Sequence, residues 1–229
     1  GSIFAITDRD APYKKIISID PRFPSERNWK TLIEGNEEEV MESANVIGKN
    51  IFVHFIKDVL SIWKVYNLDG EYIKTIDLPG EGIVYGFGGK VDQIKTWFSF
   101  NNLVTPTSIY EYDILSNKSE IYTPSYSKFL SDDYIQKQEF FESKDGTMIP
   151  IFIAHKKDIQ LDNRRPTLLY GYGGFNISVK PSFQKQNTII LENNGVFAIA
   201  NLRGGGEYGE KWHRDGMLLN KQNVFDDFI

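Results

Sequence analysis

The sequence predicts a mixed fold in two parts: the last blades of a β-propeller over residues 1–133, and then the N-terminal part of an α/β domain over residues 134–229. Three observations support this prediction. Short β-rich runs and turn signals fill the first part, and no helical period of comparable length appears before residue 130. A hairpin pattern repeats along these runs. In the second part, two continuous apolar runs are each followed by glycines.

The runs of the first part have the β-branched and aromatic content that is typical of strands. They are Ile3–Thr7, Lys15–Asp20, Ile51–Ile56, Ile62–Leu68, Tyr72–Asp77, Ile94–Phe100 and Ser108–Ile114. Dipeptides that favour turns, such as Asp69-Gly70 and Gly88-Gly89, lie between them. Short strands at even spacing are typical of a sandwich, a barrel or a propeller.

An internal repeat favours the propeller. In three hairpins an apolar strand ends in an aspartate, and a turn and a second strand follow. These aspartates are Asp20, Asp69 and Asp113, at intervals of 49 and 44 residues. A four-stranded propeller blade needs about that length, although a sandwich with similar hairpins remains the alternative. A closed propeller needs at least four blades, so we expect this chain to lack the earlier ones.

A hairpin opens the second part, because the turn dipeptide Asp145-Gly146 separates the strand Gln136–Glu142 from the strand Met148–Ala154. After a charged loop, Thr167–Tyr170 and Val196–Ala200 are continuous apolar runs. Strands of this kind are buried on both faces, as in α/β proteins. We therefore expect both runs to lie inside a sheet.

The last segment, Gln222–Ile229, predicts the beginning of a helix. Asn220 or Asn223 could cap this helix, and Asp226 and Asp227 would then lie near its positive end. Natural domains rarely stop within such an apolar-periodic segment. We therefore expect the protein to continue beyond it.

The charge of the chain argues against two classes of partner. Lys and Arg number 26 and Asp and Glu number 31, so the net charge is −5 and no basic excess is available for nucleic acid or for an anionic membrane. A run of about 18 apolar residues, as a membrane helix needs, is also missing from the sequence. The chain has no cysteine, which excludes disulfides, zinc–cysteine sites and cysteine nucleophiles.

The three histidines do not have the spacing of metal ligands, so we predict neither a metal site nor a cofactor. His54 lies in a predicted strand and is interpreted as a packing residue. His155 precedes Lys156-Lys157 and is expected to be solvated. His213 lies in a turn-rich loop, where a catalytic role is the less favoured interpretation.

Two glycine-rich segments are the candidates for chemistry. Neither has the Lys-Ser or Lys-Thr ending of a phosphate-binding loop, so nucleotide binding is not favoured. Around Gly171–Phe175 an apolar strand, glycines and a loop follow one another, as in the oxyanion loop of α/β-hydrolases. Tyr172 would supply a phenol donor there. A tight turn with Tyr172 as a surface aromatic explains the pattern equally well.

The second glycine-rich segment, Arg203–Gly209, favours a structural interpretation, in which Arg203 and Glu207 form a local ion pair that shapes the loop. No G-x-S-x-G is present in the sequence. Ser178 and Ser182 lack the strand–turn–helix context that a nucleophile elbow needs. A complete serine triad can therefore not be assembled from this chain.

Several segments resemble the prolyl oligopeptidase family of serine peptidases. They are Thr167–Ser178, Asn201–Glu210, Trp212-His213, Asn220–Asn223 and Phe225–Phe228. The resemblance is highly specific from about residue 140 to residue 229 and extends more weakly through the first part. The related oligopeptidases B share the segment Arg203–Gly209 but usually depart from Gly-Gly-Phe-Asn at residues 173–176, so the prolyl enzymes are favoured.

The resemblance implies a β-propeller that covers an α/β-hydrolase domain, and cleavage of short proline-containing peptides after proline by a Ser-Asp-His triad. By position, Tyr172 would be the oxyanion phenol, and Phe175 would help to line the apolar pocket near the proline. In the family the triad lies downstream of the segment that matches Phe225–Phe228. The chain alone is therefore expected to be inactive, with the rest of the same polypeptide as its partner.

Two alternatives to this function stay open at this point. One is a non-catalytic propeller-type scaffold or binding module, and the other is a related oligopeptidase that prefers basic residues. The expected location is the cytoplasm, with the periplasm and secretion left open. A G-x-S-x-G downstream of Ile229 would favour the enzyme.

Overall fold

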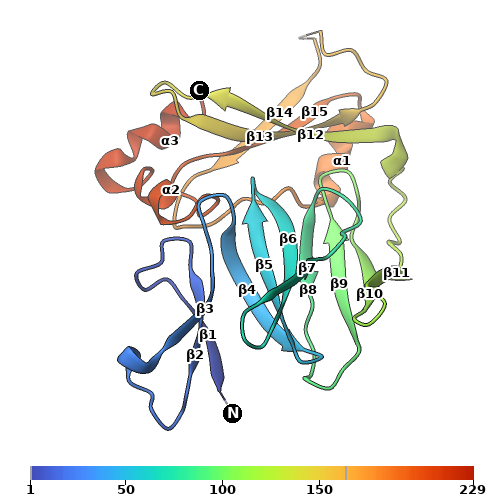
Figure 1. Ribbon diagram of the computed structural model, residues 1–229. Coiled ribbons are helices and arrows are strands. Elements are labelled where there is room, and N and C mark those ends of the chain that lie inside the picture. The colour runs from blue at the N-terminus through green and yellow to red at the C-terminus, as the bar shows by residue number, and fades with distance from the viewer. Residues whose placement is uncertain (1, 163) are drawn as a thin grey trace.

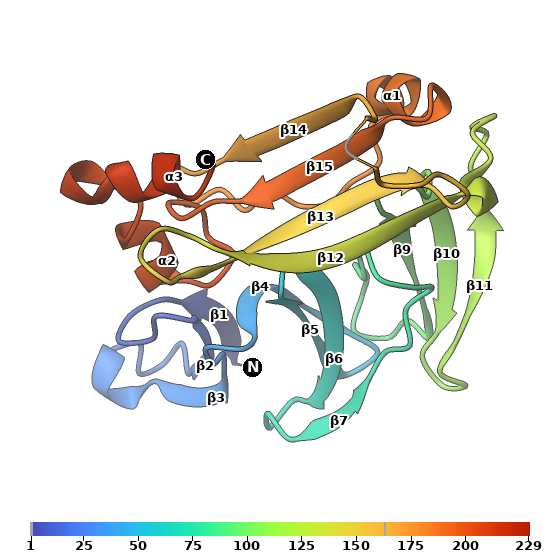
Figure 2. The ribbon, with the colours of Figure 1, turned by 90° about the horizontal axis from the view of Figure 1, so that it is seen from above.

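The computed structural model describes residues 2–162 and 164–229. In these residues the strands form four sheets, and three of the sheets stand beneath the fourth (Figure 1). Seen from above, the lower sheets follow one another in chain order, and the upper sheet lies across them (Figure 2). The predicted mixed fold is confirmed, since antiparallel sheets come first and a mixed sheet with short helices follows.

The three lower sheets contain the first eleven strands. The first sheet contains β1 (Ile3–Thr7), β2 (Lys15–Ile19) and β3 (Lys30–Glu34). The second contains β4 (Val40–Ile47), β5 (Asn50–Lys57), β6 (Leu60–Asn67) and β7 (Tyr72–Thr75). The third contains β8 (Ile83–Gly86), β9 (Lys95–Asn101), β10 (Ser108–Asp113) and β11 (Lys118–Thr123).

Strand pairing in the lower sheets is local and sequential, as in propeller blades. β2 pairs with β1 and β3, and β10 pairs with β9 and β11, each time antiparallel. Within the described residues no ladder joins β2 to β10, which a Greek-key sandwich would allow. The prediction of twisted blades is confirmed, and the sandwich is excluded.

Two strands of the lower sheets have no counterpart in the sequence prediction. β4 contains Glu42, Ser43 and Asn45, and its pairing with β5 is interrupted by an irregularity between Met41 and Ser43. The polar residues and the irregularity hide the two-residue period on which the prediction depends. β8 is only four residues long and ends in a glycine.

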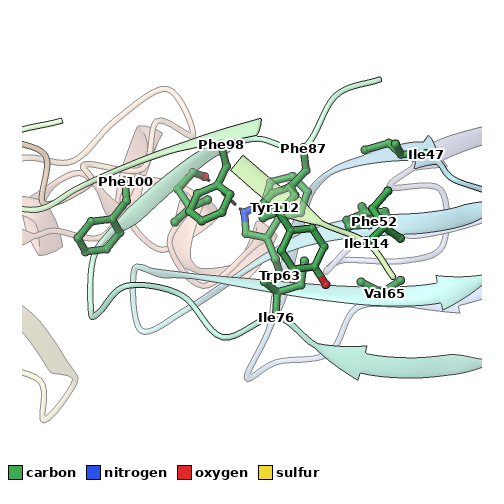
Figure 3. Packing of buried hydrophobic residues seen from close by; sticks show 11 residues of the cluster. Ile47, Phe52, Trp63, Val65, Ile76, Phe87, Phe98, Phe100, Tyr112 and Ile114 are labelled. Atoms are coloured by element: carbon green, nitrogen blue, oxygen red, sulfur yellow. Dashed lines mark hydrogen bonds between the residues drawn. The ribbon is translucent and has the colours of Figure 1, made fainter. Parts of the chain in front are cut away.

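Aromatic side chains fill the space between the second and third sheets (Figure 3). Phe87 lies at the centre of this cluster, with its ring centroid 4.7 Å from those of Trp63 and Phe98 and 5.6 Å from that of Tyr112. All four side chains are almost completely buried. Because burial of such a side chain stabilises a fold by roughly 1.5–3 kcal/mol, this cluster fixes the two sheets against each other.

The upper sheet has the strand order β12–β13–β15–β14. Its strands are β12 (Tyr134–Glu142), β13 (Met148–Lys156), β14 (Thr167–Tyr172) and β15 (Val196–Asn201). β13 pairs antiparallel with β12 and β15, and β14 pairs parallel with β15. The α-helices are α1 (Thr188–Glu192), α2 (Glu210–Arg214) and α3 (Gln222–Asp226). Short 3-10 turns occur at Glu26–Asn28, Ser131–Asp133, Lys185–Asn187 and Leu218–Asn220.

The two continuous apolar runs of the upper sheet have different environments. Every residue of β15 is buried, as predicted. In β14, however, Leu168, Leu169 and Tyr170 are 45%, 40% and 50% exposed, so the prediction of a strand buried on both faces is wrong here. The reason is position, because β14 is an edge strand of the described sheet and β15 lies inside it.

The turn between β5 and β6 joins the second sheet to the upper sheet. Asp58 and Val59 form this two-residue turn, and both have positive φ, 46° and 68°. The carbonyl of Asp58 accepts a hydrogen bond from Gln138 (2.6 Å), and its carboxylate accepts one from the Tyr208 hydroxyl (2.9 Å). Val59 is fully buried in a cluster with Phe152 of the upper sheet.

Two classes of feature are absent from the part of the chain that the structure describes. None of its helices has the length and apolar character needed to cross a membrane. Nor does it contain a group of three or more His, Asp and Glu side chains that could hold a metal ion.

Candidate active site

The end of β14 and the loop that follows it pack against the residues after β15 and against α3 and its flanking residues. Gly171 and Gly173 make this packing possible, because a Cβ on Gly171 would lie 2.6 Å from the Phe228 ring. A Cβ on Gly173 would lie 2.3 Å from the carbonyl oxygen of Arg203 and 2.6 Å from Val224. Both positions therefore need glycine for close packing rather than for a positive φ.

The backbone of this loop is strained at two consecutive residues. Phe175 and Asn176 have φ values of 54° and 57°, in the left-handed region that non-glycine residues rarely adopt. Backbone hydrogen bonds hold this conformation, from the Asn176 N–H to the Gly204 carbonyl (3.1 Å) and from the Ile177 N–H to the Gly174 carbonyl (3.1 Å). Each such residue costs about 1–3 kcal/mol, and such residues cluster at functional sites.

The two predicted site residues lie at the end of β14 and on the loop that follows it. Tyr172 is the last residue of β14, and its side chain folds over Gly174: its hydroxyl oxygen is 3.7 Å from the point where a Cβ on Gly174 would lie. No hydrogen bond among the described residues uses this hydroxyl, and Tyr172 is 37% exposed. Phe175 is 84% exposed. The loop thus presents a free phenol donor and an exposed aromatic ring.

A lysine that the sequence interpretation did not single out also contacts this loop. The Nζ of Lys221 donates a hydrogen bond to the carbonyl of Gly173 at 2.5 Å. The two residues are 48 positions apart in the chain. No local spacing could indicate this contact, although Lys221 lies within one of the segments that carry the family resemblance.

The expected ion pair between Arg203 and Glu207 is wrong. Arg203 instead binds Asp227, with Nη2–Oδ1 at 2.5 Å and Nε–Oδ2 at 3.0 Å, and it also binds Asp145. The side chains of Arg203 and Asp227 are 4% and 0% exposed, and the Ser143 hydroxyl donates a further bond to Asp227 (2.7 Å). Hydrogen bonds to Asp227 raise the pKa of Arg203, and the Arg203 guanidinium holds the pKa of Asp145 well below its usual range.

Glu207 is buried on its own, away from Arg203. Its Oε1 accepts hydrogen bonds from the Val179 N–H (2.9 Å) and from the Asn201 amide (3.2 Å). Its Oε2 has no hydrogen-bond partner among the described residues. Because burial disfavours the charged carboxylate, the pKa of Glu207 is raised to about 7. The second glycine-rich segment therefore has a structural role through different partners from those expected.

The predicted caps of α3 are also wrong. The N-cap residue is Lys221, while the side chains of Asn220 and Asn223 donate to the carbonyls of Arg214 (3.1 Å) and Asp215 (2.8 Å). The first turn of α3 contains no acidic residue. Tertiary contacts occupy the side chains that a local pattern assigns to the helix end.

The three histidines do not come together. His54 is buried and stacks on Trp63 at 4.8 Å, which confirms its packing role, and burial lowers its pKa to about 4. His155 was expected to be solvated, but this expectation is wrong, because it is only 6% exposed and its Nδ1 lies 2.8 Å from the carbonyl oxygen of Lys156. The Nδ1 of His213 lies 3.2 Å from the Asn176 N–H and 2.8 Å from the Gly204 carbonyl, so His213 contacts the strained loop.

Comparisons with known protein families agree with this architecture. The model of the N-terminal β-propeller domain of prolyl oligopeptidase matches residues 2–125, and the model of the prolyl oligopeptidase family matches residues 181–229. A prolyl endopeptidase of Elizabethkingia meningoseptica is 40% identical over 228 residues. One of Dictyostelium discoideum is 40% identical over 242 residues. Each alignment covers 100% of this chain and 32% of the relative, so the chain spans about a third of their length.

Solved structures give the same result. A structure from a study of two prolyl endopeptidases superposes with a TM-score of 0.93 at 37% identity, over 99% of this chain and 34% of that one. Prolyl oligopeptidase B from Galerina marginata, bound to a hydrolysis and macrocyclization substrate, superposes with a TM-score of 0.90 at 27% identity. That match covers 99% of this chain and 32% of the other.

Proposed function

This chain belongs to the prolyl oligopeptidase family, and on this premise we propose that the whole protein is a serine endopeptidase that cleaves short peptides on the C-terminal side of proline. The observation that carries the proposal is the strained loop after β14. It presents the Tyr172 hydroxyl free of hydrogen bonds among the described residues, next to an exposed Phe175.

The proposed domain boundary lies between Asp133 and Tyr134. Residues 1–133 then contribute propeller blades, and residues 134–229 begin the peptidase domain. Two features support this division. The antiparallel pairing of the lower sheets ends with β11 at Thr123, and the first strand of the upper sheet begins at Tyr134.

In the proposed reaction, a serine supplied by the rest of the polypeptide attacks the carbonyl carbon of the prolyl peptide bond, and its proton passes to the triad histidine. The carbonyl oxygen becomes negative as the tetrahedral intermediate forms, and Tyr172 donates its O–H to that oxygen. Collapse breaks the C–N bond, the amine leaves with the proton, and water hydrolyses the ester. Phe175 contributes apolar surface to the pocket that holds the proline ring.

The edge of β14 is the proposed docking line for the rest of the polypeptide. An unpaired strand edge is a template for a further strand. Leu168, Leu169 and Tyr170 leave apolar surface exposed along β14. A strand that pairs there would cover this surface and would end next to Tyr172. The proposed location is the cytoplasm, which cell fractionation of the native protein would test.

The experiment is Tyr172→Phe in the full-length protein, measured on a proline-containing peptide with the chemical step rate-limiting. Loss of one oxyanion donor lowers kcat by about 10²–10³, or roughly 2.7–4 kcal/mol. KM should change little, because the negative charge develops only in the transition state. Tyr126→Phe is the matched control, since it removes a hydroxyl from a side chain that is 88% exposed. An unchanged kcat in Tyr172→Phe would refute the oxyanion role.

A further inference from the structure

The polar ends of Lys221 and Tyr172 lie near the same point beside Gly174. Nζ of Lys221 is 3.8 Å from the point where a Cβ on Gly174 would lie, and the Tyr172 hydroxyl oxygen is 3.7 Å from the same point. The ammonium nitrogen and the phenol oxygen are therefore at most about 7.5 Å apart, the sum of these two distances. The ammonium also donates to the carbonyl of Gly173, the residue directly after Tyr172.

The segment that carries Lys221 contacts the loop at three points. Lys221 donates a hydrogen bond to the Gly173 carbonyl, Val224 packs against the α-carbon of Gly173, and Phe228 packs against Gly171. Positions separated by three or four residues lie on the same face of a helix. One face of α3 and its flanking residues therefore supports the backbone on both sides of Tyr172.

This supporting segment is itself held in place. Asp227, one residue before Phe228, is fully buried and forms several hydrogen bonds with Arg203, two residues after the end of β15. Among the ion pairs of the described residues, none includes Lys221. The positive charge of Lys221 is therefore directed at the loop instead of at a carboxylate.

We propose that Lys221 is a positioning residue of the oxyanion site. Its hydrogen bond to Gly173 fixes the peptide group that follows Tyr172, and so fixes the direction in which the phenol donates. The inference rests on the proposed function, because it assigns Lys221 an effect only through the role of Tyr172.

A double-mutant cycle in the full-length protein tests the proposal. Lys221→Met is expected to lower kcat about tenfold and to leave KM within twofold, since the loss of a charged hydrogen bond misplaces the donor without removing it. In the Tyr172→Phe background the same substitution should change kcat less than twofold. Lys221→Arg, which keeps the charge and a donor, should recover most of the lost rate.

The controls separate positioning from a general effect on the fold. Lys185→Met removes the same charge from another exposed lysine and should leave kcat unchanged. A merely structural role of Lys221 predicts the same loss of kcat in both backgrounds, and that result would overturn the proposal. So would an unchanged kcat in Lys221→Met while Tyr172→Phe alone is slow. If Tyr172→Phe alone is silent, the proposed function falls together with this inference.

Discussion

The buried pair of Arg203 and Asp227 gives the sharpest test of how this chain is held together. The substitution Asp227→Asn keeps the shape of the side chain but removes its charge. It also places an amide N–H₂ where a carboxylate oxygen now accepts hydrogen bonds from the guanidinium of Arg203, at 2.5–3.1 Å. Arg203, with only 4% of its side chain exposed, would keep Asp145 as its counter-charge.

The expected magnitude follows from burial. Removal of one partner of a buried ion pair costs about 3–5 kcal/mol, because the other charge stays buried. Since Asp145 still neutralises part of that charge, we expect the lower end, about 3 kcal/mol. Asp145→Asn is the matched control. Its side chain is 47% exposed, so the loss should be about 1 kcal/mol or less.

Urea unfolding followed by tryptophan fluorescence measures both variants. Trp212 is buried beside the pair and donates its indole N–H to the Leu202 carbonyl (3.2 Å), so its emission reports on this region. With a denaturant slope of about 2–3 kcal/mol/M, Asp227→Asn should lower the urea midpoint by about 1–1.5 M. A midpoint within about 0.3 M of the wild type, or an equal shift in Asp145→Asn, would refute the reasoning.

Four further outcomes are expected. Burial raises the pKa of Glu207 from 4.5 to about 7, so the folded state keeps the carboxyl proton to a higher pH than the unfolded state. The free energy of unfolding therefore falls as the pH rises from 4.5 to about 7. In Glu207→Gln the urea midpoint should depend less on pH over this range. Burial lowers the pKa of His54 from 6.5 to about 4, so the free energy of unfolding falls as the pH drops from 6.5 to about 4. In His54→Gln the urea midpoint should no longer show this decrease. Gly173→Ala should cost about 1–3 kcal/mol in thermal unfolding through overpacking, whereas Gly88→Ala, which has open space around it, should be nearly neutral. Because the sequence has no G-x-S-x-G, residues 1–229 alone should not hydrolyse a chromogenic Gly-Pro peptide, and turnover with serine labelling by a phosphonate would contradict this expectation.

Local patterns were sufficient to predict most strands and the blade repeat. The alternation and turn dipeptides of the first part are properties of neighbouring residues, and the hairpins they predict close within a few residues. The sequence did not predict β4, because polar residues and an irregularity interrupt its alternation, and it did not predict β8, because that strand is very short. The exposure of β14 could not be predicted, since an apolar run does not say whether a neighbouring strand will lie on each side.

The contacts of the candidate site depended on distances along the chain that no local pattern covers. Arg203 has its partners 24 and 58 positions away, at Asp227 and Asp145. Glu207 is close to Arg203 in the sequence, which suggested a local ion pair between them. In the structure Glu207 is buried apart from Arg203, and its carboxylate accepts hydrogen bonds from Val179 and Asn201. Tyr172 was predicted from its glycine-rich context and from the family resemblance, and Phe175 from the resemblance alone; both roles stay predictions.

The turn of Asp58 and Val59 has a consequence for which changes of chain length the protein tolerates. An insertion of one residue between β5 and β6 would move Val59 out of its buried place against the upper sheet and would separate Asp58 from Tyr208. The turn between β10 and β11 has contacts only within the lower sheets, through Ile114 and Asn117, and Leu115 at its tip is 77% exposed; no hydrogen bond among the described residues joins this turn to the upper sheet. We therefore expect the protein to tolerate changes in hairpin length, including inserted peptide tags, at the hairpin ends that point away from the upper sheet. The same changes should destabilise it at the hairpin ends that contact the upper sheet.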